Sequence, residues 1–262
     1  MDLGLNGKVV IVLGAAAQGN MGQGIARAFV GEGAQVMIAG RHEDALRALA
    51  DEIGCGWMLC DITSKADVDA LVDGAIATFG KVDVGINCTG FGLMKSIIET
   101  TAAELEQMAA VQFVGPFQFF QALLRGMTAG GSIIQLTSAT AKIMLDNHAA
   151  YRGTKAAIDQ VIRSIAWEFG KQGIRANSIA PGLTDSPMAA EAYAVPAIIA
   201  LFDKETPMGR TGTVDDIAAA CLFVASDRCF MTGQGLQVNG GITLGRNPTA
   251  QEIMDAAMAG AG

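Results

Sequence analysis

The chain has 262 residues, of which 51% are hydrophobic and 6% are aromatic, and its formal net charge at pH 7 is −8. The excess of acidic residues and the lack of a basic stripe argue against nucleic acid or an anionic membrane as a partner. The apolar stretches at residues 9–17 and 192–202 are too short to span a membrane, and the N-terminal residues do not resemble a signal peptide. We therefore expect a cytoplasmic protein.

The cysteines and histidines exclude several kinds of site. The five cysteines are odd in number and form no Cys-x-x-Cys motif, so we expect reduced thiols in the core. Only two histidines are present, His42 and His148, and neither has other ligand residues at a fitting spacing. The sequence therefore predicts no metal site and no Ser-His-Asp triad.

Short β-rich segments alternate with longer segments of helical periodicity along the chain. The first strands are expected at KVVIVLG, AQVMIAG, GWMLCD and VDVGIN, and later ones at GSIIQLTS, GIRANSIAPG and GQGLQVNGG. Between them, residues 102–127 are expected to form one long helix. Because the strands are apolar without alternation, helices should cover both faces of the sheet. We predict a single α/β dinucleotide-binding and catalytic domain over residues 1–262, with a Rossmann-type doubly wound, seven-stranded parallel sheet.

The first expected strand is followed by a glycine-rich turn that opens a helix. In this position glycines let the backbone approach a pyrophosphate, and the helix N-terminus attracts its charge. The turn is about four residues longer than the usual form of this motif, which leaves open which amides contact phosphate. The glycines are Gly14, Gly19, Gly22 and Gly24.

The ends of the next strands suggest which dinucleotide binds. The second strand ends in Gly40-Arg41, so no carboxylate is available for the ribose diol of NAD, and Arg41 can pair with the 2′-phosphate of NADP. We therefore predict NADP(H) rather than NAD(H), the alternative being that Arg41 is a surface charge. Asp61 and Ile62 close the third strand and are candidates for the adenine pocket, although Asp61 could instead cap the next helix. Asn87 closes the fourth strand and could hold the neighbouring loop.

Tyr151 and Lys155 lie four residues apart in a segment of helical periodicity, so their side chains share one face. An ammonium group beside a phenol favours the phenolate and should lower its pKa, which equips Tyr151 to transfer a proton. The alternative is a solvated pair on a helix surface.

Several motifs occur in the order found in one enzyme family. Besides the glycine turn, they are Asp61, Asn87 with Gly90, Ser138 thirteen residues before Tyr151, Lys155, Pro181-Gly182 followed by Thr184, and Asn239 to Gly241. Over about residues 5–245 the chain resembles the single-domain short-chain dehydrogenase/reductase family.

This resemblance implies roles for the matching residues. Tyr151 would be the general acid for ketone reduction and the base for alcohol oxidation, and Lys155 would hold the nicotinamide ribose and lower the pKa of Tyr151. Ser138 would donate a hydrogen bond to the substrate oxygen. The segment with Pro181, Gly182 and Thr184 would hold the nicotinamide carboxamide. The family also usually forms tetramers through the helices that correspond to residues 101–127 and 151–170, so a homotetramer is expected.

The chain departs from the family at Gln112, where similar proteins carry a catalytic asparagine that supports a proton-relaying water near the lysine. Gln112 could preserve that relay through its main-chain carbonyl if the helix is kinked there. Alternatively, it only packs, and the proton takes another route.

The substrate pocket is expected to be apolar and rich in methionine. Its candidates come from the segment between Ser138 and Tyr151 and from a lid over residues 184–206, an apolar connection long enough to form short helices. Besides Ser138, the candidate residues are Ile143, Met144, Leu145, Met188 and Tyr193.

These observations predict an oxidoreductase that transfers a hydride reversibly between NADP(H) and a hydrophobic ketone or secondary alcohol. One alternative is a catalytically weak cofactor-binding subunit, suggested by Gln112 and the long glycine turn. The other is an enoyl or acyl-chain reductase of the same fold. Those enzymes place the lysine seven residues after the tyrosine, where this chain has Ile158.

Overall fold

The computed structural model describes residues 2–259, and its centre is a seven-stranded parallel sheet with the strand order β3-β2-β1-β4-β5-β6-β7. The predicted doubly wound sheet is confirmed. Strand β1 is buried at every position, as its uninterrupted apolar sequence requires. The strands are β1 (Val9–Leu13), β2 (Gln35–Gly40), β3 (Gly56–Leu59), β4 (Val84–Asn87), β5 (Gly131–Leu136), β6 (Ile174–Pro181) and β7 (Gly235–Val238).

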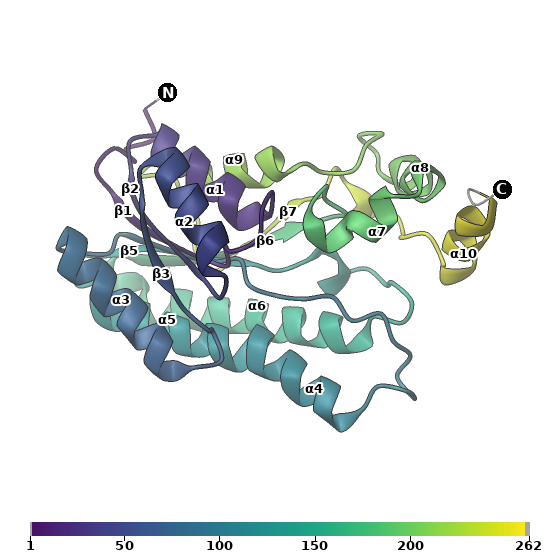
Figure 1. Cartoon of the computed structure of the whole chain (residues 1–262), viewed down its shortest axis with the longest axis horizontal. Helices are drawn as coiled ribbons and strands as arrows, with labels where there is room; N and C mark the ends of the chain where they lie inside the picture. The colour runs from purple at the N-terminus through teal and green to yellow at the C-terminus, as the bar shows by residue number, and fades with distance from the viewer. Residues whose placement is uncertain (1, 260–262) are drawn as a thin grey trace.

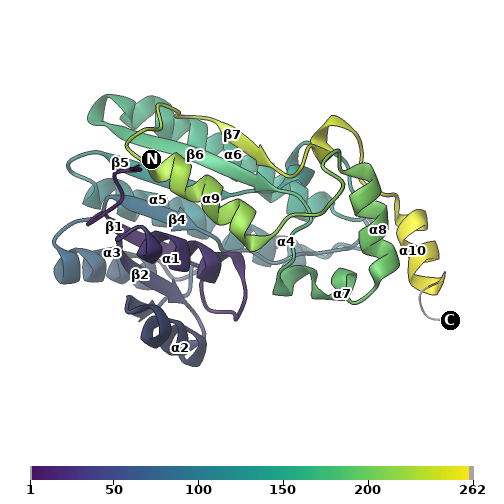
Figure 2. The same cartoon turned by 90° about the horizontal axis from the view of Figure 1, so that it is seen from above.

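Helices cover both faces of the sheet (Figures 1 and 2). One apolar cluster joins the sheet to α1 (Met21–Gly31), α2 (Glu43–Ile53) and α9 (Val214–Ala225). A second cluster joins the opposite face to α3 (Lys65–Phe79), α5 (Gly115–Gly126) and α6 (Ala149–Phe169). This layering puts the carboxyl ends of all seven strands at one edge, where ligands bind in such folds.

The expected long helix over residues 102–127 is interrupted. It begins as α4 (Ala102–Ala109), continues as a π-helical turn over Ala110–Val114 and resumes as α5. A π-turn inserts one extra residue into a helix and frequently marks a functional site. Here it contains Gln112, whose side chain is buried.

The connection over residues 184–206 contains short helices, as its apolar sequence predicted. After a single turn at Pro187–Ala189 come α7 (Ala190–Tyr193) and α8 (Pro196–Glu205). Together with α10 (Ala250–Ala259), they pack into a small third apolar cluster at the end of the molecule beyond the strand ends. None of the helices described is both long and apolar enough to cross a membrane.

The restart of the helix after the π-turn depends on Gly115. A β-carbon at this position would lie 2.4 Å from the main-chain oxygen of Ile62. We expect Gly115→Ala to destabilise the fold by about 1–3 kcal/mol, because backbone must move to relieve the clash. Gly153→Ala is the matched control, since no atom lies within 4 Å of its β-carbon position in α6. That control should gain up to about 1 kcal/mol from helix propensity. Urea unfolding of both variants tests the expectation, and equal stabilities would contradict it.

Candidate active site

A cavity of about 460 Å³ opens beside the carboxyl ends of β1, β2 and β4. Strands β2 and β3 are added on one side of β1, and β4 to β7 are added on its other side. Open α/β sheets bind ligands at the point where the strand order changes side in this way. The cavity wall includes six of the residues predicted to bind the cofactor, namely Gly14, Gly22, Arg41, Asp61, Ile62 and Gly90.

Glycine is required for different structural reasons at the positions of the first turn. Gly14 has φ +104° and Gly19 has φ +73°, conformations that side chains disfavour. A β-carbon on Gly22 would lie 2.5 Å from the carbonyl oxygen of Gly14, so this glycine lets α1 begin directly against the strand end. Gly24 instead faces α9, where a β-carbon would collide with Val214. Gly14 and Gly22 therefore shape the cavity, whereas Gly24 serves helix packing.

Two polar side chains that sequence reasoning missed hold the long turn together. Asn20 caps α1 by accepting from the main-chain N–H of Gln23 at 2.9 Å, and its Nδ2 donates to the carbonyl of Gly14 at 2.8 Å. Gln23 Nε2 donates to the carbonyl of Ala15 at 3.2 Å. An asparagine just before an expected helix was the available signal. The extra residues thus form an ordered turn.

Arg41 and Asp61 both line this cavity. The Asp61 carboxylate accepts from the main-chain N–H and the hydroxyl of Thr63 at 2.9 and 2.7 Å. These bonds lower the pKa of Asp61, and the positive charge of Arg41 contributes further. Asp61 closes a turn rather than capping α3, whose N-cap is Ser64.

Asn87 is fully buried and ties the loop after β4 to the sheet. Its Nδ2 donates to Gln135 on β5 at 2.8 Å, and its Oδ1 accepts from the N–H and the hydroxyl of Thr89 at 3.1 and 2.8 Å. The loop it holds carries Gly90 to the cavity wall.

Ser138, Tyr151 and Lys155 meet near the end of β5. Ser138 follows that strand and caps a short turn at Ala139–Ala141. The buried ammonium of Lys155 lies 5.5 Å from the centre of the Tyr151 ring and donates to the carbonyl of Leu136 at 3.0 Å. Ser138 lies close enough to Tyr151 to lower the pKa of its phenol, and the Ser138 hydroxyl shares a hydrogen bond with that of Thr140 at 2.9 Å. The expected helical face is therefore buried beside the serine, which excludes a solvated surface pair.

The pKa values differ from the sequence expectation. Burial raises the pKa of Tyr151 to about 12, and the hydrogen bond with Ser138 only partly opposes this. Burial likewise lowers the pKa of Lys155 to about 8. The direction of the pKa shift of Tyr151 is opposite to the one expected from its spacing to Lys155, because desolvation is the largest cause of its shift.

Gln112 reaches the same place from the π-turn. Its Nε2 lies 3.2 Å from the hydroxyl of Thr154 and also contacts the sulfur of Met108, whereas its buried Oε1 has no hydrogen-bond partner. A β-carbon on Gly90 would lie 2.7 Å from this Oε1 and 3.3 Å from Lys155 Nζ. The missing side chain of Gly90 thus leaves a carboxamide oxygen and an ammonium group facing a common space.

The predicted nicotinamide segment follows β6 and does not line the cavity. Thr184 is buried, and its hydroxyl donates to the carbonyl of Gly182 at 3.1 Å. Gly182, just after Pro181, lies against Asn239, where a β-carbon would approach to 3.1 Å. The segment is therefore braced by the Asn-Gly-Gly turn that follows β7.

The predicted substrate residues divide among three places. Met188 lines the large cavity. Ile143, Met144 and Leu145 line a second cavity of about 400 Å³, which they share with residues 245–249. The hydroxyl of Tyr193 donates to that of Thr211, beyond the end of the connection, at 2.8 Å.

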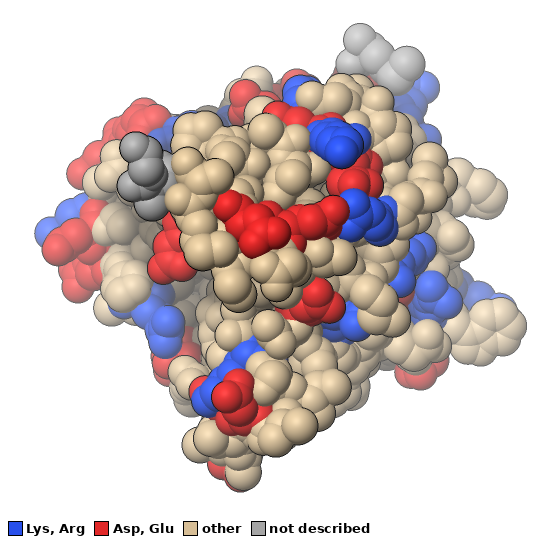
Figure 3. Space-filling model, turned by 90° about the vertical axis from the view of Figure 1, so that its right-hand side faces the viewer, with Lys and Arg blue, Asp and Glu red and all other residues tan. Residues whose placement is uncertain are grey.

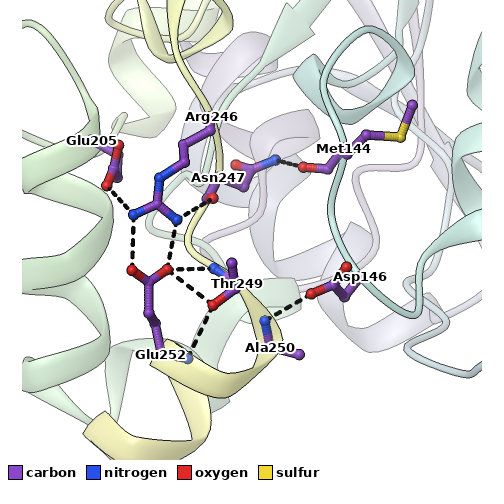
Figure 4. A network of polar contacts seen from close by, with 8 residues as sticks. All are labelled: Met144, Asp146, Glu205, Arg246, Asn247, Thr249, Ala250 and Glu252. Atoms are coloured by element: carbon purple, nitrogen blue, oxygen red, sulfur yellow. Dashed lines mark hydrogen bonds and ion pairs between the residues drawn. The ribbon is translucent and has the colours of Figure 1, made fainter.

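The C-terminal segment was not expected to take part in the site, yet it closes the second cavity (Figure 4). Asn247 Nδ2 donates to the carbonyl of Met144 at 2.8 Å, and Asp146 accepts from the N–H of Ala250 at 2.9 Å. Arg246 pairs with Glu205 of α8 at 2.7 Å and with Glu252 of α10 at 2.6 Å. No sequence pattern indicates contacts between segments a hundred residues apart.

Figure 3 looks onto this end of the molecule, where α8 and α10 lie. Acidic and basic side chains adjoin each other on this face instead of forming an extended patch of one sign. The ion pairs of Arg246 belong to this mixed surface.

Comparisons with known proteins identify the family. The family model described as enoyl-(acyl carrier protein) reductase matches residues 14–243. D-threitol dehydrogenase of Mycolicibacterium smegmatis is 32% identical, over 93% of this chain and 95% of that protein. This chain belongs to the short-chain dehydrogenase/reductase family. The 7alpha-hydroxysteroid dehydrogenase of Escherichia coli K12 is 35% identical, over 92% of this chain and 96% of its own length.

Solved structures of short-chain dehydrogenases agree with the fold described above. A short-chain type dehydrogenase/reductase from Mycobacterium ulcerans superposes with a TM-score of 0.90 at 28% identity, over 94% of this chain and 93% of that chain. A 3-ketoacyl-(acyl-carrier-protein) reductase from Brucella melitensis, complexed with NADH, gives 0.85 at 28% identity, over 91% and 99%. The protein is therefore a dehydrogenase of a family that uses NAD(P)(H).

Cysteines and possible metal ligands are the other groups that could add chemistry to the site described above. All five cysteines are free thiols. Within residues 2–259, no group of three or more His, Cys, Asp or Glu side chains is arranged to hold a metal ion.

The polar contacts of Arg246 should hold the C-terminal segment in place. We expect Arg246→Met to increase amide hydrogen exchange in residues 247–259 by on the order of tenfold, because both carboxylate partners are lost at once. Arg163→Met is a matched control, since its 3.4 Å pair with Asp159 is exposed on α6. Exchange measured by mass spectrometry checks this, and unchanged protection in the Arg246 variant would contradict it.

Proposed function

We propose that this short-chain dehydrogenase transfers a hydride reversibly between NADP(H) and a hydrophobic ketone or secondary alcohol. The observation that carries the proposal is the group of half-buried Ser138 with buried Tyr151 and Lys155 next to the large cavity. Support comes from relatives named D-threitol dehydrogenase and 7alpha-hydroxysteroid dehydrogenase, whose names point to alcohol substrates.

Each side chain has a role that its position permits. Tyr151 gives its phenolic proton to the substrate oxygen during reduction and takes it back during oxidation. Ser138 donates a hydrogen bond to the same oxygen as negative charge develops there. Lys155, held by the Leu136 carbonyl, supplies positive charge beside the phenol and a donor for the nicotinamide ribose. The bound cofactor supplies or accepts the hydride.

The cavity fits a dinucleotide. Gly14 and Gly22 bring the start of α1 to its wall, where free main-chain N–H groups favour phosphate. Asp61 and Ile62, which line the cavity, would contact the adenine, and Gly90 lies towards Lys155. We further propose that Pro181, Gly182 and Thr184 bind the nicotinamide carboxamide, with Asn87 holding the loop between the two halves. Gly19 keeps the turn in its left-handed conformation, and Gly24 acts through packing.

Gln112 is proposed to keep the proton path open behind Lys155. Its unpaired Oε1 and the Lys155 ammonium face the space left by Gly90, so the carboxamide can accept a proton-carrying hydrogen bond there. This extends the expectation that the main-chain carbonyl serves the relay, because here the side chain itself offers the acceptor. Met188 and the segment Ile143 to Leu145 form the apolar walls for the substrate, beneath the lid of residues 184–206.

The enzyme is proposed to work as a cytoplasmic homotetramer. The helices expected to form the interface expose apolar side chains, including Leu105, Val114, Phe117 and Trp167. Exposed apolar side chains that gather into a patch often mark protein interfaces, so these residues are candidates for burial between copies.

An enoyl reductase is the second candidate, because the matching family model carries that description. The position seven residues after Tyr151 is occupied by Ile158, which is fully buried in the core beneath α6. The lysine arrangement of this chain therefore favours reduction of a carbonyl group.

Replacement of Tyr151 tests the reaction directly. We expect Tyr151→Phe to lower turnover of a ketone and alcohol panel by about 10²- to 10⁴-fold, because the proton donor is lost. NADPH binding, followed by its fluorescence, should change little, since the ring remains in place. Turnover close to that of the parent would refute the assignment of Tyr151.

Replacement of Arg41 tests the cofactor preference. We expect Arg41→Leu to reduce kcat/KM for NADPH by about 10- to 100-fold and to leave that for NADH nearly unchanged, because only NADPH carries a phosphate to pair with the guanidinium group. Arg47→Leu is the control, since Arg47 is exposed on α2 and pairs with Glu43. An equal loss with both cofactors would contradict a 2′-phosphate contact.

A further inference from the structure

His148 lies directly beside the proposed general acid, and the proposed function assigns it no role. It is the N-cap residue of α6, three positions before Tyr151, and the two ring centres are 4.5 Å apart with a 37° tilt. Its side chain is only 9% exposed. A histidine buried against a catalytic ring is thus part of the same site.

The backbone holds His148 in this position at a cost. Asn147 has φ 55° and is the only non-glycine residue with positive φ in the described part of the chain. Its carbonyl accepts from the N–H of Lys95 at 2.6 Å, which joins the loop after β4 to the loop before α6. Left-handed backbone at a non-glycine residue is disfavoured, although asparagine tolerates it better than most, and it is often found at functional sites.

His148 also carries an unpartnered ring nitrogen, because its buried Nδ1 has no hydrogen-bond partner among the described residues. Burial, with the nearby charge of Arg152, lowers the pKa of His148, so the ring is neutral at pH 7. In a neutral imidazole one ring nitrogen carries the proton and the other accepts a hydrogen bond, so Nδ1 can serve as an acceptor.

We propose that His148 Nδ1 accepts a hydrogen bond from a second hydroxyl group of the substrate, adjacent to the reacting carbinol or carbonyl. The substrate class is then a vicinal diol, polyol or α-hydroxy ketone with an apolar remainder. This inference rests on the proposed function, because it places the reacting oxygen at Tyr151 and Ser138.

The chemistry of the surroundings supports a hydroxyl rather than another group. An imidazole nitrogen without a proton can bind only a donor, so a second carbonyl or a carboxylate would not satisfy it. Arg152 is the nearby charged donor, and its Nε is already bonded to the carbonyl of Thr140 at 2.6 Å. The 4.5 Å spacing of the two ring centres places the imidazole beside the phenol that would bind the reacting oxygen.

The decisive comparison uses cyclohexanol and trans-cyclohexane-1,2-diol, which differ in one hydroxyl, as substrates of the full-length enzyme with NADP⁺. We expect the parent to prefer the diol. His148→Phe keeps a ring against Tyr151 but has no acceptor, so the ratio of kcat/KM for the diol to kcat/KM for cyclohexanol should fall by about 10- to 100-fold. His148→Asn, whose Oδ1 can stand in the place of Nδ1, should recover most of this ratio.

The ratio within each variant is independent of how much enzyme is folded. If both alcohols are oxidised and the ratio is the same in the parent and in His148→Phe, the inference about His148 is wrong while the proposed function stands. If the parent oxidises neither alcohol and reduces neither corresponding ketone, the proposed function fails and the inference fails with it. A ratio that falls in His148→Phe and recovers in His148→Asn establishes the hydroxyl contact.

Discussion

The site depends on one buried ammonium group and the carbonyl that holds it. Lys155 donates to the oxygen of Leu136 at 3.0 Å and so joins the middle of α6 to the end of β5. Burial brings the pKa of this lysine from 10.5 to about 8, so the charged form is penalised in the folded state. This penalty is present below pH 8 and is relieved as the pH rises towards 10.5. The fold thus accepts a loss of stability at neutral pH to keep a positive charge beside Tyr151.

Two buried polar atoms next to this lysine and tyrosine have no hydrogen-bond partner among the described residues, namely Gln112 Oε1 and His148 Nδ1. Gln112 Oε1 lies near the Lys155 ammonium across the space left by Gly90, and the His148 ring lies beside the Tyr151 ring. Buried unpaired groups are costly, and their position next to Tyr151 and Lys155 is consistent with a site whose partners arrive with the ligands.

The sheet, its helical layers and the group around Tyr151 could be predicted because each rests on local sequence. Uninterrupted apolar strands, glycines at the first turn and the spacing from Ser138 to Lys155 all act over short ranges. The contacts of Asn20 and Gln23 were missed because the extra turn residues gave no regular pattern. The C-terminal closure was missed because Arg246 meets Glu205 only after the whole chain has folded. The pKa of Tyr151 was misjudged because spacing does not report burial.

The π-turn at Ala110–Val114 changes how the whole segment from Ala102 to Gly126 is used. One extra residue in a helix rotates everything after it by about 100°, so two successive faces can serve different purposes. Gln107 and Val111 line the large cavity, whereas Phe119, Phe120 and Leu123 pack against the sheet. Because of this rotation, the first half of the helical segment lines a cavity, and its second half packs in the core of the domain.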